Sequence, residues 1–106
     1  MKITAPKHLS KEAKSLWSRL QKEYDIDDEA GFLILQTAME AFDRMRESQI
    51  IIKIEGMQVQ DRFGQYKAHP LTVTERDSRA AMMAALKALN LDLEPLNDKP
   101  GRPAGR

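Results

Sequence analysis

The chain has 106 residues, of which 42% are hydrophobic, 31% charged and 6% aromatic, and its formal net charge is +1. A chain of this length buries one modest core, and this composition is typical of a helical globular protein rather than a disordered or membrane protein. The absence of cysteine excludes disulfides, thiolate metal sites and a cysteine nucleophile, and no apolar run approaches the roughly 20 residues of a membrane span.

Charge is unevenly distributed along the chain. Residues 1–24 carry six basic and two acidic side chains, whereas residues 25–56 carry three basic and eight acidic ones. Residues 97–106 carry three basic side chains and one acidic one. Both ends are therefore basic, and we expect an anionic partner to bind there. Residues 1–7 lack the apolar stretch of a signal peptide, so we expect a cytosolic protein without a membrane anchor.

A first helix is predicted over residues 11–24. Ser10 can cap it, because its hydroxyl can accept a hydrogen bond from a free N–H of the first turn. The apolar residues recur at spacings of three and four and form one stripe, Ala13, Leu16, Trp17, Leu20 and Tyr24. The helix therefore has an apolar side and a basic outer side, and we interpret Trp17 as a core residue rather than a base-stacking one.

A second, long helix is predicted over residues 28–54, after an acidic run at 25–29. We interpret this run as a helix break in which Asp27 or Asp28 caps the restart, rather than as a metal site. Gly56 can end the helix. Its wide apolar face comprises Phe32, Leu33, Leu35, Ala38, Met39, Phe42 and Met45.

The end of this helix carries more isoleucine than one chain can bury. Four isoleucines within five residues cannot all face one core if the segment stays helical, so it either becomes a strand or packs against another subunit. The expected oligomer interface comprises Phe42, Met45, Ile50, Ile51, Ile52 and Ile54.

A short β-hairpin is predicted between Gly56 and His69, with Gly64 supplying the left-handed conformation of its turn. Such a hairpin is marginal alone and needs support from helices or a partner chain. His69, which precedes a proline, is interpreted as a residue that fixes a bend rather than as a metal ligand or proton shuttle.

A third helix is predicted over residues 72–90, with Thr72 or Thr74 as its N-cap and Asn90 as its C-cap. Its expected apolar positions include Ala80, Met83, Ala84, Leu86, Ala88 and Leu89. Residues 97–106 have no apolar pattern and are rich in Pro and Gly. We therefore expect one helical domain over residues 1–96 and a flexible basic tail over residues 97–106.

Catalytic motifs are not evident in the sequence. There is no phosphate-binding loop, nucleophile elbow or zinc spacing, and we expect a non-catalytic protein without metal or cofactor. The basic ends are the type of electrostatic surface that attracts phosphate backbones by releasing counterions. The DNA-binding candidates, chosen on charge alone, are Lys2, Lys7, Lys11 and Lys14 at the N-terminal end and Arg102 and Arg106 in the tail.

The order of features along the chain resembles one protein family. The matching elements are His8-Leu9-Ser10, Glu12-Ala13 and Trp17, then Gly64 and His69-Pro70, and finally Leu89-Asn90-Leu91 and Pro95. This succession is similar to the HK97-like family of phage terminase small subunits over about residues 5–96. Asn90 stands where that family has glycine, a substitution tolerated at a left-handed cap.

The resemblance implies a mainly α subunit with a long central helix, a short β-hairpin and a C-terminal helix, assembling into a homo-oligomeric ring of about nine copies. It also implies an adaptor that acts in the host cytoplasm. Such an adaptor binds double-stranded viral DNA and stimulates the ATPase and nuclease of the large terminase subunit during genome packaging.

Two other classes of function fit the residues alone. In the first, helix one and the start of helix two form a helix-turn-helix of a dimeric DNA-binding regulator. In the second, the long helix docks on a partner protein and the charges serve only solubility. A dimer with a symmetric operator footprint would support the first, and absence of salt-sensitive DNA binding would favour the second.

Overall fold

The structure of the protein, a computed structural model, describes residues 3–89. In chain order the described elements are α1 (Lys11–Tyr24), α2 (Glu29–Glu55), β1 (Gln58–Gln60), β2 (Tyr66–Ala68) and α3 (Leu71–Ala88). The predicted fold class, mainly α with a long central helix, a short hairpin and a C-terminal helix, is confirmed. The predicted tail over residues 97–106 and the predicted cap Asn90 lie outside the described residues.

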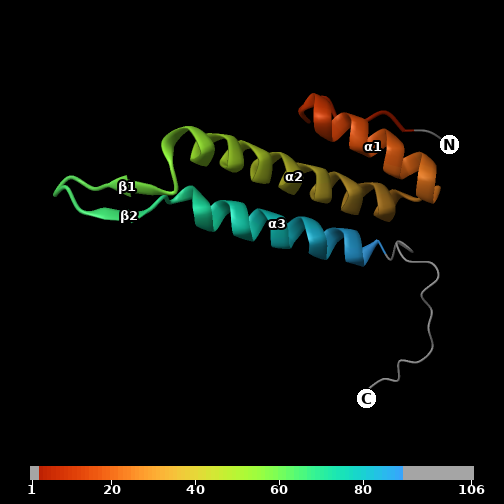
Figure 1. Ribbon diagram of the computed structural model, residues 1–106. Coiled ribbons are helices and arrows are strands. Elements are labelled where there is room, and N and C mark those ends of the chain that lie inside the picture. The colour runs from red at the N-terminus through yellow and green to blue at the C-terminus, as the bar shows by residue number, and fades with distance from the viewer. Residues whose placement is uncertain (1–2, 90–106) are drawn as a thin grey trace, which may run out of the picture.

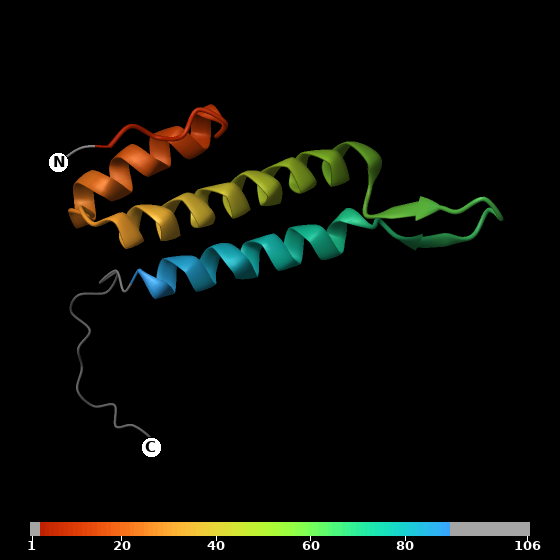
Figure 2. The same ribbon diagram turned by 180° about the vertical axis from the view of Figure 1, so that it is seen from behind.

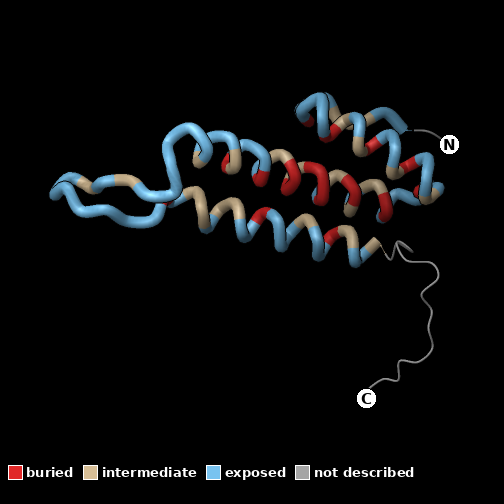
Figure 3. The backbone as a smooth tube through the Cα atoms, in the orientation of Figure 1, coloured by how far each residue is buried: buried red, intermediate tan, exposed pale blue. Residues whose placement is uncertain are grey.

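The helix α2 is the centre of the molecule. It forms an antiparallel pair with α3, and α1 packs on the first half of α2, on the side away from α3 (Figures 1 and 2). The buried residues lie where α1 and α2 meet and along the face of α2 toward α3 (Figure 3). The core is formed by Leu9, Ala13, Trp17, Ile26, Leu35, Ala38, Met39, Phe42, Met45 and Ala85.

The start of α1 is capped as predicted. The Ala13 N–H donates to Ser10 Oγ at 3.0 Å, and the apolar stripe faces inward, with Trp17 only 2% exposed and stacked on Phe32 at a ring distance of 5.9 Å. Asp25 ends the helix in the left-handed conformation, at φ 52°. The acidic run is therefore a helix break, and Asp28 is the N-cap of α2, although its side chain makes no capping hydrogen bond.

The segment with four isoleucines stays helical, so the strand alternative is wrong. The helix α2 ends at Glu55 and is terminated by Gly56 at φ 93°, as predicted. Ile50, Ile51 and Ile54 are exposed, and Ile52 is half-buried. Leu33, expected on the apolar face, is also exposed, because it lies on the side of α2 that neither neighbouring helix covers.

The start of α3 differs from the prediction. The helix begins at Leu71 with Pro70 at the N-cap position, and neither Thr72 nor Thr74 caps it. Instead the Leu71 N–H donates to the ring Nδ1 of His69 at 3.0 Å. A histidine ring thus replaces the hydroxyl cap, because the proline at the cap position has no capping side chain.

The inner face of α3 is shifted from the one predicted. Ala85 is buried, and Met82, Leu86 and Leu89 pack against the core. Met83 lies on the outer face with 55% of its surface exposed. The repeated alanines left this face ambiguous in the sequence, since alanine is tolerated on either side of a helix.

The hairpin is confirmed and extends beyond the ends of α2 and α3 (Figure 1). Its strands are antiparallel, with Val59 opposite Lys67, and Gly64 takes the left-handed conformation at φ 80°. No helix among the described residues is long and apolar enough to cross a membrane.

Candidate nucleic-acid interface and assembly surfaces

The outer side of α1 carries a row of cations. With 3.6 residues per turn, Lys11, Arg19 and Lys22 project from the outer side of the helix, and Lys14 lies at the edge of that side, half-buried and one turn from Trp17. We call this set, Lys11, Lys14, Arg19 and Lys22, the basic side of α1. Within residues 3–89 none of these four forms an ion pair. Their charges therefore remain available to an anionic partner.

The segment before α1 brings a fifth cation to this surface. It runs back along α1 and is held there by the Trp17 Nε1–H, which donates to the Ile3 carbonyl at 2.9 Å. Lys7 from this segment and Lys14 from α1 line one groove of about 370 Å³, together with residues such as Ser18. The structure therefore places three of the predicted DNA-binding residues, Lys7, Lys11 and Lys14, on or beside the first turn of α1. Lys2, Arg102 and Arg106 lie outside the described residues.

Two acidic side chains of α2, Asp43 and Glu40, bind the segment before α1 and not these lysines. Asp43 accepts from both the Ser10 N–H, at 2.8 Å, and the Ser10 hydroxyl, at 2.5 Å. Arg46 and Glu12 form a two-bond ion pair at 2.9 and 3.3 Å. This network orients the start of α1 on α2, and the sequence did not reveal it, since its partners are 33 and 34 residues apart.

His8 and Glu40 complete the network. The His8 Nε2 lies 2.7 Å from a carboxylate oxygen of Glu40, and Gln36 donates to the same oxygen at 3.0 Å. The hydrogen bond from Gln36, followed by that from His8, lowers the pKa of Glu40 below its usual value. Glu40 therefore stays ionised, and through His8 it holds the segment before α1 against α2.

The predicted oligomer interface divides into two groups. Phe42 and Met45 lie in the core of the single chain. Ile50 and Ile54 are 59% and 77% exposed, on the side of α2 that α1 covers further toward the N-terminus. The start of α1 lies beside Asp43 and Arg46, so α1 does not cover this side of α2 from there to Glu55. Ile50 and Ile54 therefore form exposed apolar surface toward the hairpin end of α2.

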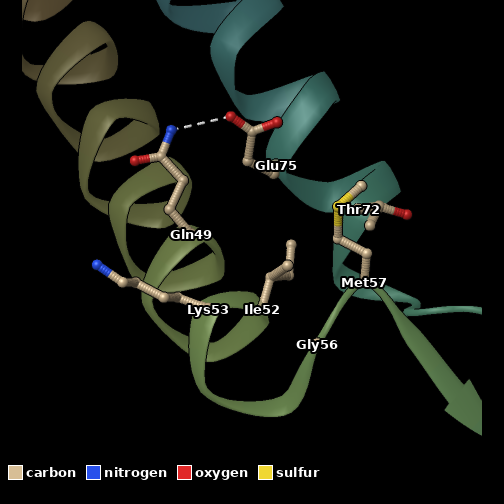
Figure 4. Close-up of a pocket in the computed structure, with 7 residues that line it drawn as sticks. All are labelled: Gln49, Ile52, Lys53, Gly56, Met57, Thr72 and Glu75. Atoms are coloured by element: carbon tan, nitrogen blue, oxygen red, sulfur yellow. Dashed lines mark hydrogen bonds between the residues drawn. The ribbon is translucent and has the colours of Figure 1, made fainter.

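A groove opens at the base of the hairpin, between the end of α2 and the start of α3 (Figure 4). We call it the hairpin-base groove; its lining residues are Gln49, Ile52, Lys53, Gly56, Met57, Thr72 and Glu75. Its volume is about 570 Å³ and its wall is mostly apolar. Ser48 and Ser78, the buried residues nearest this end of the helix pair, are small and polar, so the helices pack closely there without a large apolar core.

The junction between hairpin and helices is fixed by His69, which is 5% exposed. Its Nδ1 accepts from the Leu71 N–H, so the ring proton is on Nε2, which donates to Glu55 at 2.7 Å. Its backbone N–H donates to the Met57 carbonyl at 2.8 Å. His69 therefore joins the end of α2, the first residue of the hairpin and the start of α3, in agreement with its predicted structural role.

The hairpin tip is a third surface, and no pattern in the sequence pointed to a function for it. The Asp61 side chain accepts from the N–H groups of Phe63 and Gln65 at 2.8 and 3.0 Å, which fixes the turn. Phe63 is 77% exposed, with the Arg62 guanidinium 5.4 Å from its ring centre. A rigid turn thus displays an aromatic ring and a cation together.

The basic side of α1 and the hairpin end are therefore separate surfaces. The helix α1 covers the first half of α2, and the hairpin with its groove lies at the other end of α2 (Figure 1). Within residues 3–89 no three histidine or acidic side chains come together in a group that could hold a metal ion. Comparison of the chain with protein families, with curated proteins and with solved structures gave no match.

Proposed function

We propose that the protein is a small terminase subunit, a non-catalytic adaptor that binds double-stranded viral DNA and recruits the large, ATP-hydrolysing terminase subunit for genome packaging. The observation that carries this proposal is the separation of two surfaces, the basic side of α1 and the exposed apolar residues at the hairpin end. One chain can then bind DNA and a neighbouring subunit at the same time. The resemblance of the sequence to the HK97-like small subunits supports the same role.

The DNA-binding part of the proposal rests on the basic side of α1. Each subunit offers a few phosphate contacts, too few for tight binding alone. A ring of about nine subunits multiplies these contacts, so that weak individual sites give strong combined binding. The small net charge of the single chain is therefore compatible with DNA binding.

The assembly part rests on the exposed apolar residues of the hairpin end. Ile54, Met57 and Phe63 are each at least 70% exposed. They lie at the end of α2, at the base of the hairpin and in its turn. Clustered exposed apolar residues mark protein contacts, whereas single ones are ordinary. A partner subunit would cover them and support the otherwise isolated hairpin.

The regulator alternative is less well supported. A helix-turn-helix places the first turn of its second helix in the major groove, close to phosphates. Here that turn carries the exposed carboxylates Asp28 and Glu29, directly after Asp27. Three negative charges at this point would repel the DNA backbone, whereas the outer side of α1 would attract it.

The proposal is tested by native mass and DNA affinity measured on the same preparation. We expect a closed oligomer, and DNA binding that weakens steeply with salt. Replacing Lys11 and Lys14 by alanine is expected to weaken binding about tenfold or more at low salt. It should also reduce the salt slope by about 0.9 for each phosphate that is no longer neutralised. The oligomer should be unchanged.

The matched control removes two cations elsewhere. Arg44 on α2 and Lys87 at the end of α3 are exposed and lie outside both α1 and the hairpin. Their double alanine variant has the same charge change and should bind DNA nearly as the unmodified chain does. Equal weakening in both variants would show that only net charge matters and that α1 is not the binding surface.

A further inference from the structure

We propose that the hairpin tip of one subunit inserts into the hairpin-base groove of the next, with Phe63 as the inserted ring. This inference rests on the proposed function, since it specifies the contact by which the ring would form. The occupant of the groove is thus a second copy of the same chain.

The groove is open and apolar in the single chain. Ile52 and Met57 supply most of its apolar wall, and Gly56 leaves one side without a side chain (Figure 4). Met57 is 70% exposed, and the flexible methionine side chain can adapt its shape to an aromatic partner. At about 570 Å³, the groove has room for a ring and part of its neighbour.

The hairpin tip has the properties of an inserting group. Its turn is already fixed by Asp61, so that little conformational entropy is lost when Phe63 is buried. An aromatic ring at an exposed turn has no function in the fold of its own chain, since Phe63 contacts no core residue. Arg62, beside that ring, adds a positive charge to the tip.

Charge does not oppose the contact. The lining of the groove holds one cation, Lys53, and one anion, Glu75, which is already paired with Arg79 at 3.2 Å. The tip likewise holds one anion, Asp61, beside one cation, Arg62. Neither surface has a net charge, so the contact depends on burying the exposed ring of the tip against the apolar wall of the groove.

One chain cannot place its own tip in its own groove. The groove lies where the hairpin begins, and the hairpin projects away from it (Figures 1 and 2). The six residues from Met57 to Phe63 span roughly 20 Å when extended. A tip and a groove on different parts of one chain give a head-to-tail contact, and such contacts produce closed rings when the rotation between subunits allows closure.

Two variants separate the tip from the groove. Phe63→Ala removes the inserted ring and keeps the groove, whereas Met57→Arg blocks the groove with a charge that repels Arg62 and keeps the ring. Each variant alone is expected to be a monomer by native mass spectrometry. An equimolar mixture is expected to give a one-to-one heterodimer and nothing larger, because only one tip and one groove remain functional.

The matched controls are exposed residues outside both surfaces. Met83→Arg introduces the same charge at a methionine on the outer face of α3, and Leu33→Ala truncates an exposed residue of α2. Both controls should keep the oligomer of the unmodified chain. Unchanged helical circular dichroism in all four variants would show that the fold is intact.

A cross-link tests the same contact directly, because the chain has no cysteine. The double variant Gln65→Cys with Lys53→Cys keeps both Phe63 and Met57, and it should form disulfides from one subunit to the next and give a ladder of multimers under mild oxidation. A double variant with Met83→Cys in place of Lys53→Cys should give no such ladder.

The outcomes separate this inference from the proposed function. If the unmodified chain is an oligomer that Phe63→Ala and Met57→Arg leave intact, the tip-to-groove contact is overturned and the adaptor role stands. If the two variants are monomers that do not pair on mixing, the tip-to-groove contact is likewise overturned. A monomeric unmodified chain that does not bind DNA overturns both.

Discussion

Asp43 is the residue through which α2 positions the start of α1. It accepts two hydrogen bonds from Ser10, whose hydroxyl in turn accepts from the Ala13 N–H. Replacing Asp43 by alanine removes both bonds and leaves the cap of α1 free to rotate. We expect the free energy of unfolding to fall by about 1–2 kcal/mol, measured by urea denaturation.

The control for this prediction is a double-mutant cycle with Ser10→Ala. If the two residues act through each other, the double variant should lose less stability than the two single variants together. Additive losses would show that Asp43 contributes by some route other than Ser10. Arg46 and Glu12, which are close to this pair, stay unchanged in all three variants.

The ionisation of Glu40 gives a prediction for pH. Its pKa is lower in the folded chain than its ordinary value of 4.5, so the carboxylate stabilises the fold above that pH. This contribution is lost as the pH falls through the lowered pKa. The difference in unfolding free energy between the unmodified chain and Glu40→Gln should therefore be present near neutral pH and decrease as the pH falls below 4.5.

The matched control for this prediction is Glu23→Gln. Glu23 is exposed on α1 and forms no hydrogen bond or ion pair within the described residues. Its replacement should change stability little at neutral or acid pH. A Glu40→Gln difference that stays constant as the pH is lowered from neutral through the acid range, until the chain unfolds, would contradict the prediction.

At the scale of the elements, Gly31 determines how closely α2 follows the turn after α1. A β-carbon at this position would lie 2.9 Å from a methyl carbon of Ile26 and 2.6 Å from a carboxylate oxygen of Asp28. Alanine ordinarily stabilises a helix by about 1 kcal/mol relative to glycine. Here we expect Gly31→Ala to destabilise the chain by about 1 kcal/mol instead, because displacing the buried Ile26 costs more.

The measurement for Gly31→Ala is thermal unfolding followed by circular dichroism. The melting temperature should fall by several degrees, of the order of 4–8 °C per kcal/mol for a domain of this size. A higher melting temperature would show that Ile26 and Asp28 move aside at little cost and that helix propensity dominates.

The elements were predictable where the local sequence determines them. Ser10, Gly56 and the apolar spacing located α1 and α2 to within about one residue at each end. The start of α3 was predicted to within one residue, but its cap was missed because it is the ring of His69, a residue outside the usual capping set. The exposure of Met83 was missed because it depends on how α3 is rotated against α2, which an alanine-rich pattern does not specify.

The site was less predictable than the fold. Charge alone identified Lys7, Lys11 and Lys14, and the structure places them on or beside the first turn of α1. The network of Asp43 and Glu40 with the start of α1 requires contacts between residues more than 30 positions apart. The hairpin-base groove likewise exists only after α2 and α3 have packed, so no local pattern could predict it.

At the scale of the whole molecule, assembly and DNA affinity should be linked. Phe63→Ala leaves every cation in place, but a monomer presents only one basic side of α1 to the DNA. We expect its affinity to be about 100-fold lower than that of the oligomer, because the combined binding of several subunits is lost. Titration of labelled DNA by fluorescence anisotropy, with Leu33→Ala as the control, measures this difference.

If Phe63→Ala were monomeric and still bound DNA as tightly as the unmodified chain, assembly would contribute nothing to DNA affinity. The converse variant, with Lys11 and Lys14 replaced, should remain an oligomer with little DNA binding. The two variants together distinguish a failure of assembly from a failure of the DNA surface.

The fluorescence of the single tryptophan can report on residues 3–10, the segment before α1. Trp17 is the only indole of the chain, and its N–H is bonded to the Ile3 carbonyl of the segment that also carries Lys7. If DNA draws Lys7 away from α1, this bond breaks and water reaches the ring. The fluorescence of Trp17 would then shift to longer wavelength. A titration with unlabelled DNA would therefore report the release of this segment directly.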